Sequence, residues 1–355
     1  MNLESIYKDR KVFITGHTGF KGSWLTTWLH QMGAQVKGYA LAPENESDLY
    51  HLIRGDELCT SVIADIRDRE RVKKEVLDFR PDFIFHLAAQ PLVKLSYEQP
   101  VDTFEVNVTG TANVLDAIRF LDKPCTALMV TTDKVYKNLE KEYPYKEDDQ
   151  LGGYDPYSAS KACAELVIDS YRNSFFHPAK YAEHKKSISS ARAGNVIGGG
   201  DWARDRIVPD IIRALSAEQA VTVRNPQSIR PWEHVLEPLH GYLTLAAHQV
   251  QDPVKYADAY NFGPRMEEKF TVQDLVDRAI AAWGGGAHQG GAQPGAHEAG
   301  LLLLDITKAG KELDWRPTFT TPEAIELTVN WYRRHLKEGA DARSLILSDI
   351  NKITV

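Results

Sequence analysis

The sequence predicts an α/β protein built on a doubly wound parallel sheet, with a smaller mixed α/β lobe toward the C-terminus. Up to about residue 194, short β-branched and apolar runs alternate with longer helical patterns, as in sheets whose strands are joined by crossover helices. Beyond that point the alternation loosens into segments rich in Gly, Pro and Arg. We therefore expect a first domain over 1–194 and a ligand-binding lobe over 195–355, some of whose segments return to the first domain.

Six strands are expected in the first domain, each a short run bounded by polar residues, Gly or Pro. They cover residues 11–15, 34–40, 57–64, 82–88, 126–132 and 187–193. The intervening segments are long enough for crossover helices. Between Arg67 and Phe79, for example, Val72 and Val76 fall on one helical face, and Pro81 cannot continue the helix.

Composition excludes several classes of protein. Hydrophobic residues make up 43% of the 355 residues and charged residues 26%, the balance of an ordinary globular protein. The longest aliphatic run, Leu301 to Leu304, is too short to cross a bilayer and the N-terminal residues build no signal-peptide core, so we expect a cytoplasmic protein. A net charge of -7 argues against broad nucleic-acid binding, which depends on Lys and Arg contacts to phosphates.

Residues 284–300 are rich in Gly and have no apolar period, so we expect a flexible surface loop there. Its two histidines, His288 and His297, have no Cys or pair of acids nearby. The three cysteines of the chain are widely spaced as well. We therefore expect neither a metal site nor a disulfide framework.

The turn after the first expected strand has the pattern of a phosphate-binding loop. Gly16, Gly19 and Gly22 are spaced G-x-x-G-x-x-G between that strand and a helical run. Glycines let the chain turn tightly while its backbone approaches a pyrophosphate, whose charge then lies at the helix N-terminus. The pattern predicts a Rossmann-type dinucleotide site. The residues expected to contact the dinucleotide here are Gly16, His17, Thr18, Gly19, Phe20 and Gly22.

The choice between NAD and NADP stays open from the residues alone. An acid at the end of the second strand usually holds the ribose 2′-OH of NAD. Here that strand runs out through Gly38 to Pro43, and the first acid is Glu44. Lys37 precedes the strand end, so a 2′-phosphate is not excluded.

Two segments carry candidate catalytic residues. Tyr157 and Lys161 are four residues apart, so on a helix both side chains leave the same face. An ammonium beside a phenol, with the nicotinamide charge nearby, favours the phenolate, and we expect a lowered pKa for Tyr157 acting as a general base. Thr132, Asp133 and Lys134 follow a predicted central strand, at the edge where open α/β sheets present reactive side chains. An adjacent acid and base indicate proton transfers beyond those of the Tyr and Lys pair.

Together these motifs resemble the extended short-chain dehydrogenase family and, within it, the NAD-dependent sugar-nucleotide 4,6-dehydratases. The resemblance spans nearly the whole chain and includes Asn107, Arg230-Pro-Trp232 and Tyr260-Asn261-Phe-Gly263. It implies a tightly bound NAD, with Asp65 and Ile66 at the adenine. The further cofactor contacts that it implies are Leu87, Ala88, Ala89, Gln90, Thr131, Tyr157 and Lys161.

The resemblance also implies a reaction. Hexose dehydratases usually carry Asp-Glu where this chain has Asp133-Lys134, and the Lys variant is similar to the branch of the family that acts on CDP-glucose, as is the run from Gly194 to Trp202. Tyr157 would take the 4-hydroxyl proton as hydride leaves C4 for NAD, with Thr132 bonded to that oxygen. Lys134 would then remove the C5 proton while Asp133 protonates the departing 6-hydroxyl, and hydride would return to C6. The product would be CDP-4-keto-6-deoxyglucose.

By the same resemblance, the lobe over 195–355 is mainly substrate-binding. The substrate contacts that it implies are Gln90, Thr132, Asn195, Arg204, Arg224, Arg230 and Asn261. Family members commonly form homodimers or dimers of dimers, here through helices at 100–119 and 154–176. Two other functions are compatible with parts of the pattern: a nucleotide-sugar 4-epimerase, which has no task for an acid and a base at 133 and 134, and a non-catalytic NAD-binding regulator, which has no need of Tyr157 and Lys161.

Overall fold

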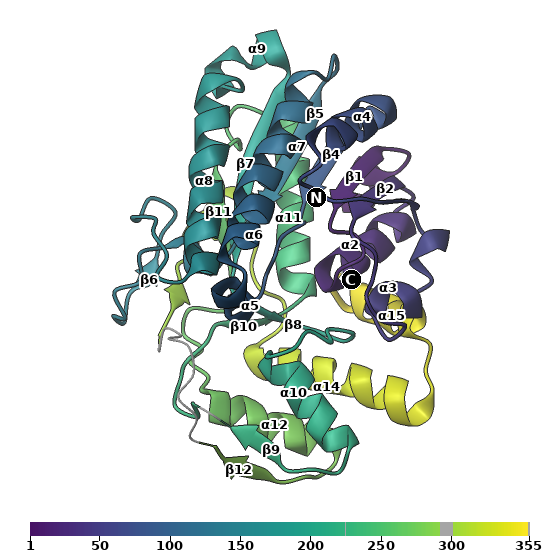
Figure 1. The fold of residues 1–355 in the computed structure, drawn as a ribbon, viewed down its shortest axis with the longest axis vertical. Helices are drawn as coiled ribbons and strands as arrows, with labels where there is room; N and C mark the ends of the chain where they lie inside the picture. Colours follow the sequence, from purple (N-terminus) through teal and green to yellow (C-terminus); the bar gives the residue numbers. More distant parts are fainter. Residues whose placement is uncertain (224, 292–300, 354–355) are drawn as a thin grey trace.

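The computed structural model describes residues 1–223, 225–291 and 301–353. Its centre is a parallel sheet of seven strands in the order β11-β7-β5-β4-β1-β2-β3 (Figure 1). All six strands expected from the sequence are present, and the predicted doubly wound parallel sheet is confirmed. The strands are β1 (Lys11–Thr15), β2 (Gln35–Ala40), β3 (Thr60–Ile63), β4 (Phe83–His86), β5 (Cys125–Val130), β7 (Lys186–Ala193) and β11 (Ala259–Phe262).

Helices cover both faces of this sheet (Figure 1). One face packs against α4 (Arg69–Phe79), α7 (Gly110–Arg119) and α8 (Pro156–Ser174), and the other packs against α2 (Phe20–Gln31) and α11 (Leu236–Gln251). Strand β1 shows the cause. Phe13 joins the first apolar layer while Val12 and Ile14 join the second, because successive side chains of a strand point to opposite faces.

Segments beyond residue 195 return to the sheet. Helix α11 packs on β5, strand β11 pairs with β7, and α15 (Ala342–Ile353) packs against α2. The remaining short elements near the sheet are α1 (Leu3–Tyr7), α3 (Leu49–Leu52), α5 (Val93–Glu98), α6 (Pro100–Phe104), α9 (Tyr181–His184), α13 (Thr307–Leu313), and the paired strands β6 (Pro144–Tyr145) and β13 (Leu303–Leu304).

The lobe below the sheet in Figure 1 combines helices with two small parallel strand pairs. Its helices are α10 (Ile207–Ser216), α12 (Val272–Trp283) and α14 (Thr321–Glu338), and its strands are β8 (Asn195–Ile197), β9 (Val221–Val223), β10 (Trp232–His234) and β12 (His288–Gly290). Among the described residues, none of the helices is both long and apolar enough to pass through a membrane.

Strand β12 is a short exposed strand within the flexible surface loop that was predicted over 284–300. His288–Gly290 pairs in parallel with Val221–Val223, and the backbone N–H of Val221 donates to the Ala287 carbonyl at 2.8 Å. Backbone hydrogen bonds to the edge of β9 do not depend on which side chains residues 288–290 carry. The composition of this segment therefore gave no sign of the pairing. Residues 292–300, including His297, lie outside the described part of the chain.

Candidate active site

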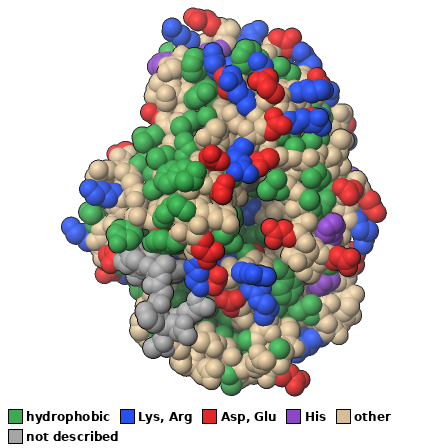
Figure 2. Space-filling model, viewed as in Figure 1, with side chains coloured by type: hydrophobic (Ala, Val, Ile, Leu, Met, Phe, Trp, Pro, Cys, Tyr) green, Lys and Arg blue, Asp and Glu red, His purple; other side chains and the backbone are tan. Residues whose placement is uncertain are grey.

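A cavity of about 2390 Å³ lies at the carboxyl ends of the sheet strands, between the sheet and the lobe. Strand order reverses between β1 and β4, and ligands of open α/β sheets bind outside such a reversal. Figure 2 shows acidic and basic side chains gathered across the middle of this face, where the two parts of the molecule meet. The position and size suit an extended ligand pair rather than one small molecule.

The glycine loop forms one wall of the cavity and could not be built from larger residues. Gly16 has φ +79°, and a Cβ there would lie 2.7 Å from the Ala88 nitrogen. A Cβ at Gly22 would lie 2.0 Å from the Gly16 carbonyl oxygen. Helix α2 begins at Phe20 with Gly19 as its N-cap, so its free N–H groups are at the loop. This cradle fits the pyrophosphate of a dinucleotide.

His17 supports the loop from behind instead of lining the cavity. The ring is fully buried, its Nε2 is 2.8 Å from the Ser61 Oγ, and it packs edge-on against Tyr50 with 5.2 Å between ring centroids. Burial lowers its pKa to about 4, so the ring is neutral. A Cβ at Gly38 would lie 2.2 Å from the ring, which explains why this position of β2 is glycine. Thr18, by contrast, lines the cavity and donates to the Leu41 carbonyl at 2.9 Å.

The other predicted cofactor residues separate into two groups. Those that line the cavity with the glycine loop are Asp65, Ile66, Leu87, Ala88, Ala89 and Thr131. The Gln90 side chain is not brought there: its Nε2 donates to the Leu92 carbonyl (3.1 Å) and to the Thr103 Oγ1 (2.9 Å). The structure therefore gives Gln90 a supporting role in the adjoining turn, which differs from the predicted contacts with cofactor and substrate.

Charges near the end of β2 favour NAD over NADP. Glu44 and Asp48 line the cavity beyond this strand, where an anionic 2′-phosphate would be repelled. Lys37, which left NADP open in the sequence, is used elsewhere, since its Nζ pairs with the Glu75 carboxylate of α4 at 2.5 Å. The described residues at this point therefore suit a free ribose hydroxyl.

Tyr157 and Lys161 lie on the first turns of α8. The helix starts at Pro156 because the Asp155 carboxylate caps it, accepting from the Ser158 N–H at 2.9 Å. Both side chains reach the cavity, and the Lys161 Nζ is 3.4 Å from the Val130 carbonyl oxygen. Burial lowers the pKa of Lys161 to about 8.

The protein groups around Tyr157 raise its pKa, and the lowering expected from the ammonium and the nicotinamide charge together stays a prediction. Burial is the largest effect and raises this pKa, because it disfavours the charged phenolate. The groups that act in the opposite direction are Lys134, the Thr132 hydroxyl and Arg206, with Lys134 the strongest of the three.

Thr132, Asp133 and Lys134 are brought together with the Tyr and Lys pair, as the sequence predicts. They follow β5 and enter a single 3-10 turn, Asp133–Val135. The Thr132 hydroxyl donates to the Asp133 Oδ1 at 2.9 Å, and the Lys134 Nζ lies 3.4 Å from the same oxygen. The Lys134 Nζ also donates to the Asn195 Oδ1 at 3.1 Å, which places a predicted substrate residue beside the candidate base.

Of the other predicted substrate residues, Arg204 and Arg230 line the cavity and Arg224 lies outside the described residues. Asn261 is not brought to the cavity. It is fully buried in β11, its Oδ1 accepts from the Tyr136 hydroxyl at 2.6 Å, and its Nδ2 donates to the Tyr145 carbonyl at 2.9 Å. With its amide used in this way, Asn261 has a structural role instead of the predicted substrate contact.

Two further charged groups lie at this centre and were not singled out from the sequence. Lys21, from the glycine loop, lines the cavity, and burial lowers its pKa although Glu233 opposes the effect. Glu233, in β10, is 2% exposed, and burial raises its pKa although the charge of Lys21 opposes the effect. The sequence did offer a sign of each: Lys21 is an amine within the glycine loop, and Glu233 is an acid between Trp232 and apolar residues that follow.

Comparison with known proteins is consistent with this geometry. The family model described as GDP-mannose 4,6 dehydratase matches residues 13–328. The chain belongs to this family of nucleotide-sugar dehydratases.

The relatives of this chain differ in how similar their sequences are to it. It is similar to a CDP-glucose 4,6-dehydratase from Salmonella typhimurium, with 46% identity over 94% of this chain and 93% of the relative. A CDP-paratose 2-epimerase from Salmonella typhi is 24% identical over 90% of this chain and 98% of its own length. Among solved structures, a Thermus thermophilus UDP-glucose 4-epimerase in complex with NAD has a TM-score of 0.75 and 26% identity, covering 91% of this chain and 99% of that chain.

Proposed function

We propose that this member of the family is an NAD-dependent lyase that converts CDP-glucose to CDP-4-keto-6-deoxyglucose and water. The observation that carries the proposal is that Asp133 and Lys134 line the same cavity as Tyr157 and Lys161. Oxidation at C4 needs only the second pair, whereas elimination of water needs an acid and a base in addition. The Salmonella relative named CDP-glucose 4,6-dehydratase, 46% identical, supports the choice of nucleotide.

The glycine loop, with Gly16, Gly19 and Gly22, would hold the pyrophosphate of NAD. NAD held there would supply the acceptor for the C4 hydride and the donor of that hydride to C6. The repulsive charges of Glu44 and Asp48 and the ion pair that occupies Lys37 support NAD over NADP. A Thermus thermophilus relative of the same fold is known as an NAD complex.

In the first half of the reaction, Tyr157 takes the proton of the 4-hydroxyl. The Thr132 hydroxyl bonds the same oxygen, and the Lys161 ammonium stabilises the phenolate that Tyr157 must become. In the second half, the 4-ketone acidifies the C5 proton, which Lys134 removes while Asp133 protonates the 6-hydroxyl and releases water. Lys134 then returns its proton to C5. Tyr157 has then gained one proton and Asp133 has lost one, so transfer of a proton from Tyr157 to Asp133 restores the starting state. Because the hydride taken from C4 returns to C6, there is no net oxidation or reduction.

The lobe supplies the nucleotide end of the site in this proposal. Arg204 and Arg230 line the cavity, and guanidinium groups suit diphosphate oxygens. Asn195 orients Lys134 through the 3.1 Å hydrogen bond to its amine. We also propose a homodimer through α6 and α8, since Val101 and Leu166 on these helices are 69% and 59% exposed.

The proposal is tested by incubating the protein and NAD with CDP-, dTDP-, UDP- and GDP-glucose and with GDP-mannose, and following the alkali-sensitive 4-keto product. We expect turnover of CDP-glucose without accumulation of free NADH. Activity confined to another nucleotide would remove the CDP assignment and keep the chemistry. Formation of a C4 epimer alone, or steady release of NADH, would contradict the dehydratase function.

A further inference from the structure

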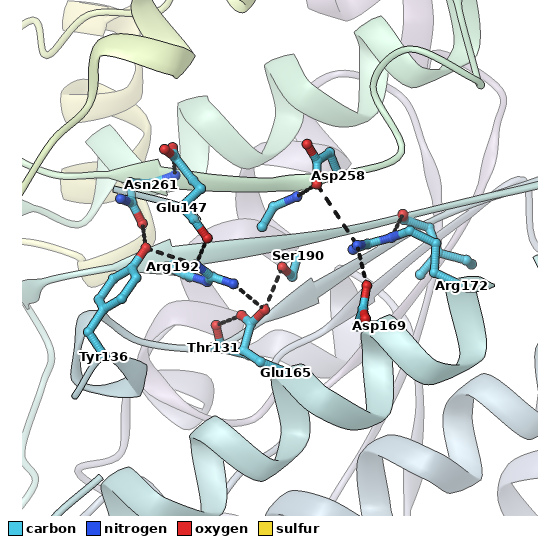
Figure 3. A network of polar contacts seen from close by, with 12 residues as sticks. Thr131, Tyr136, Glu147, Glu165, Asp169, Arg172, Ser190, Arg192, Asp258 and Asn261 are labelled. Atoms are coloured by element: carbon cyan, nitrogen blue, oxygen red, sulfur yellow. Dashed lines mark hydrogen bonds and ion pairs between the residues drawn. The ribbon is translucent and has the colours of Figure 1, made fainter. Parts of the chain in front are cut away.

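The glutamate one turn beyond Lys161 has no part in the reaction above. Tyr157, Lys161 and Glu165 occupy positions i, i+4 and i+8 of α8 and so share one face of the helix. The Glu165 carboxylate pairs at 2.8 Å with the guanidinium of Arg192 from β7, and both side chains are about 95% buried (Figure 3). Because desolvation costs such a pair much of its attraction, its place beside the catalytic helix needs a reason other than stability.

This ion pair binds the chain on both sides of the turn that carries Thr132, Asp133 and Lys134. On the near side, the Thr131 hydroxyl donates to the Glu165 Oε1 (Figure 3). On the far side, the Arg192 Nη1 donates to the Tyr136 hydroxyl at 2.9 Å (Figure 3). A single buried pair therefore holds both ends of this turn, which we call the elimination turn (residues 131–136), to the helix of Tyr157 and Lys161.

Tyr136 extends the connection to the edge of the sheet. It is 1% exposed, its hydroxyl donates to the Asn261 Oδ1 at 2.6 Å, and its ring lies parallel to that of Tyr145 with 5.3 Å between centroids. The Arg192 guanidinium also lies 5.1 Å from the centroid of the Tyr136 ring. The far end of the elimination turn is thus fixed by hydrogen bonds and packing at once.

We propose that Glu165 and Arg192 are positioning residues that set the distance between the oxidation pair, Tyr157 and Lys161, and the elimination pair, Asp133 and Lys134. One bound hexose must present C4 to the first pair and C5 and C6 to the second. Proton transfer demands heavy-atom separations near hydrogen-bond length, and a misplacement of about 1 Å costs on the order of 10²-fold. This inference rests on the proposed dehydratase function.

The test compares Tyr136→Phe and Glu165→Gln with the wild-type enzyme in single turnovers of CDP-glucose with NAD. Appearance of reduced nicotinamide reports C4 oxidation, and the 4-keto-6-deoxy product reports elimination. We expect the rate of elimination to fall by about tenfold or more. The rate of C4 oxidation and the CDP-glucose concentration that half-saturates it should change by less than about twofold, so that reduced nicotinamide accumulates transiently. Tyr7→Phe is the matched control, because Tyr7 is equally buried and its hydroxyl donates to the Leu243 carbonyl at 2.7 Å in α11.

The two rates in these variants distinguish failure of the positioning role from failure of the proposed function. A parallel fall of both rates, or an unchanged ratio of oxidation to elimination in Tyr136→Phe, would overturn the positioning role while the wild-type enzyme still formed product. Glu165→Gln leaves Arg192 buried without its anion, so if that variant does not fold, Tyr136→Phe alone decides. Absence of 4-keto-6-deoxy product from the wild-type protein would instead overturn the proposed function, and the positioning role with it.

Discussion

Replacement of Asp133 by Asn separates the two halves of the proposed reaction. The Asp133 carboxyl is 1% exposed and accepts from the Thr132 hydroxyl at 2.9 Å. An asparagine oxygen accepts the same hydrogen bond, so the geometry of Thr132 is kept. The amide cannot deliver a proton to the 6-hydroxyl, however, so water loss should stop at the 4-ketone.

Asp133→Asn should affect the rate of elimination much more than the rate of C4 oxidation. A lost general acid costs about 10²- to 10⁴-fold, equivalent to roughly 3 to 5 kcal/mol of transition-state stabilisation. The Lys134 Nζ, 3.4 Å from the Asp133 Oδ1, can still donate to the asparagine oxygen, so this contact is kept. Elimination should therefore fall by at least about 100-fold, while C4 oxidation changes by less than about threefold.

Rapid-mixing absorbance of the reduced nicotinamide, with chemical quench for the 4-keto-6-deoxy product, measures both steps. Asp116→Asn is a suitable control. Asp116 is a buried carboxylate on α7 that does not line the cavity, and it pairs at 3.0 Å with Arg69 of α4. Wild-type rates of water loss in Asp133→Asn would refute the role of Asp133 as the acid.

Three further variants test other parts of the site. Tyr157→Phe should slow C4 oxidation by about 10²- to 10⁴-fold and leave the calorimetric Kd for CDP-glucose within about threefold, and equal losses in both would contradict its role as base. Gly22→Ala should weaken NAD retention on gel filtration, because the new Cβ would meet the Gly16 carbonyl oxygen at 2.0 Å, and undiminished retention would count against the cradle. Glu233→Gln should raise the thermal midpoint relative to wild type more at pH 8 than at pH 5. Burial raises the pKa of Glu233, so the folded state keeps a proton that the unfolded state releases above the ordinary value, and stability is lost as pH rises above that value. An equal difference at both pH values would contradict this assignment.

Local patterns predicted six of the seven strands of the central sheet, because most of them are short runs with apolar or β-branched residues and are followed by a crossover helix. Strand β11 was missed for the opposite reason. Tyr260 and Asn261 were recognised as a motif, but their strand character depends on pairing with Ala191 and Arg192 far back in the chain. Strand β12 likewise exists through its pairing with β9.

The candidate site shows the same division. The spacing of Tyr157 and Lys161 on one helix, and the adjacency of Thr132 and Asp133, are local properties that the sequence displays directly. The contacts of Asn261 with Tyr136 and Tyr145 are not, because they join three segments distant in the chain. The raised pKa of Tyr157 in the protein alone is not a local property either, because burial outweighs the opposing effects of Lys134, Thr132 and Arg206.

The most direct test of the central claim is the fate of the hydrogen on C4. CDP-glucose carrying deuterium at C4 should give CDP-4-keto-6-deoxyglucose with that deuterium on C6, as read by mass spectrometry and NMR of the product. Loss of the label to solvent or to free reduced cofactor, or a product that keeps its 6-hydroxyl, would contradict a dehydratase in which both proton-transfer pairs act on one bound hexose.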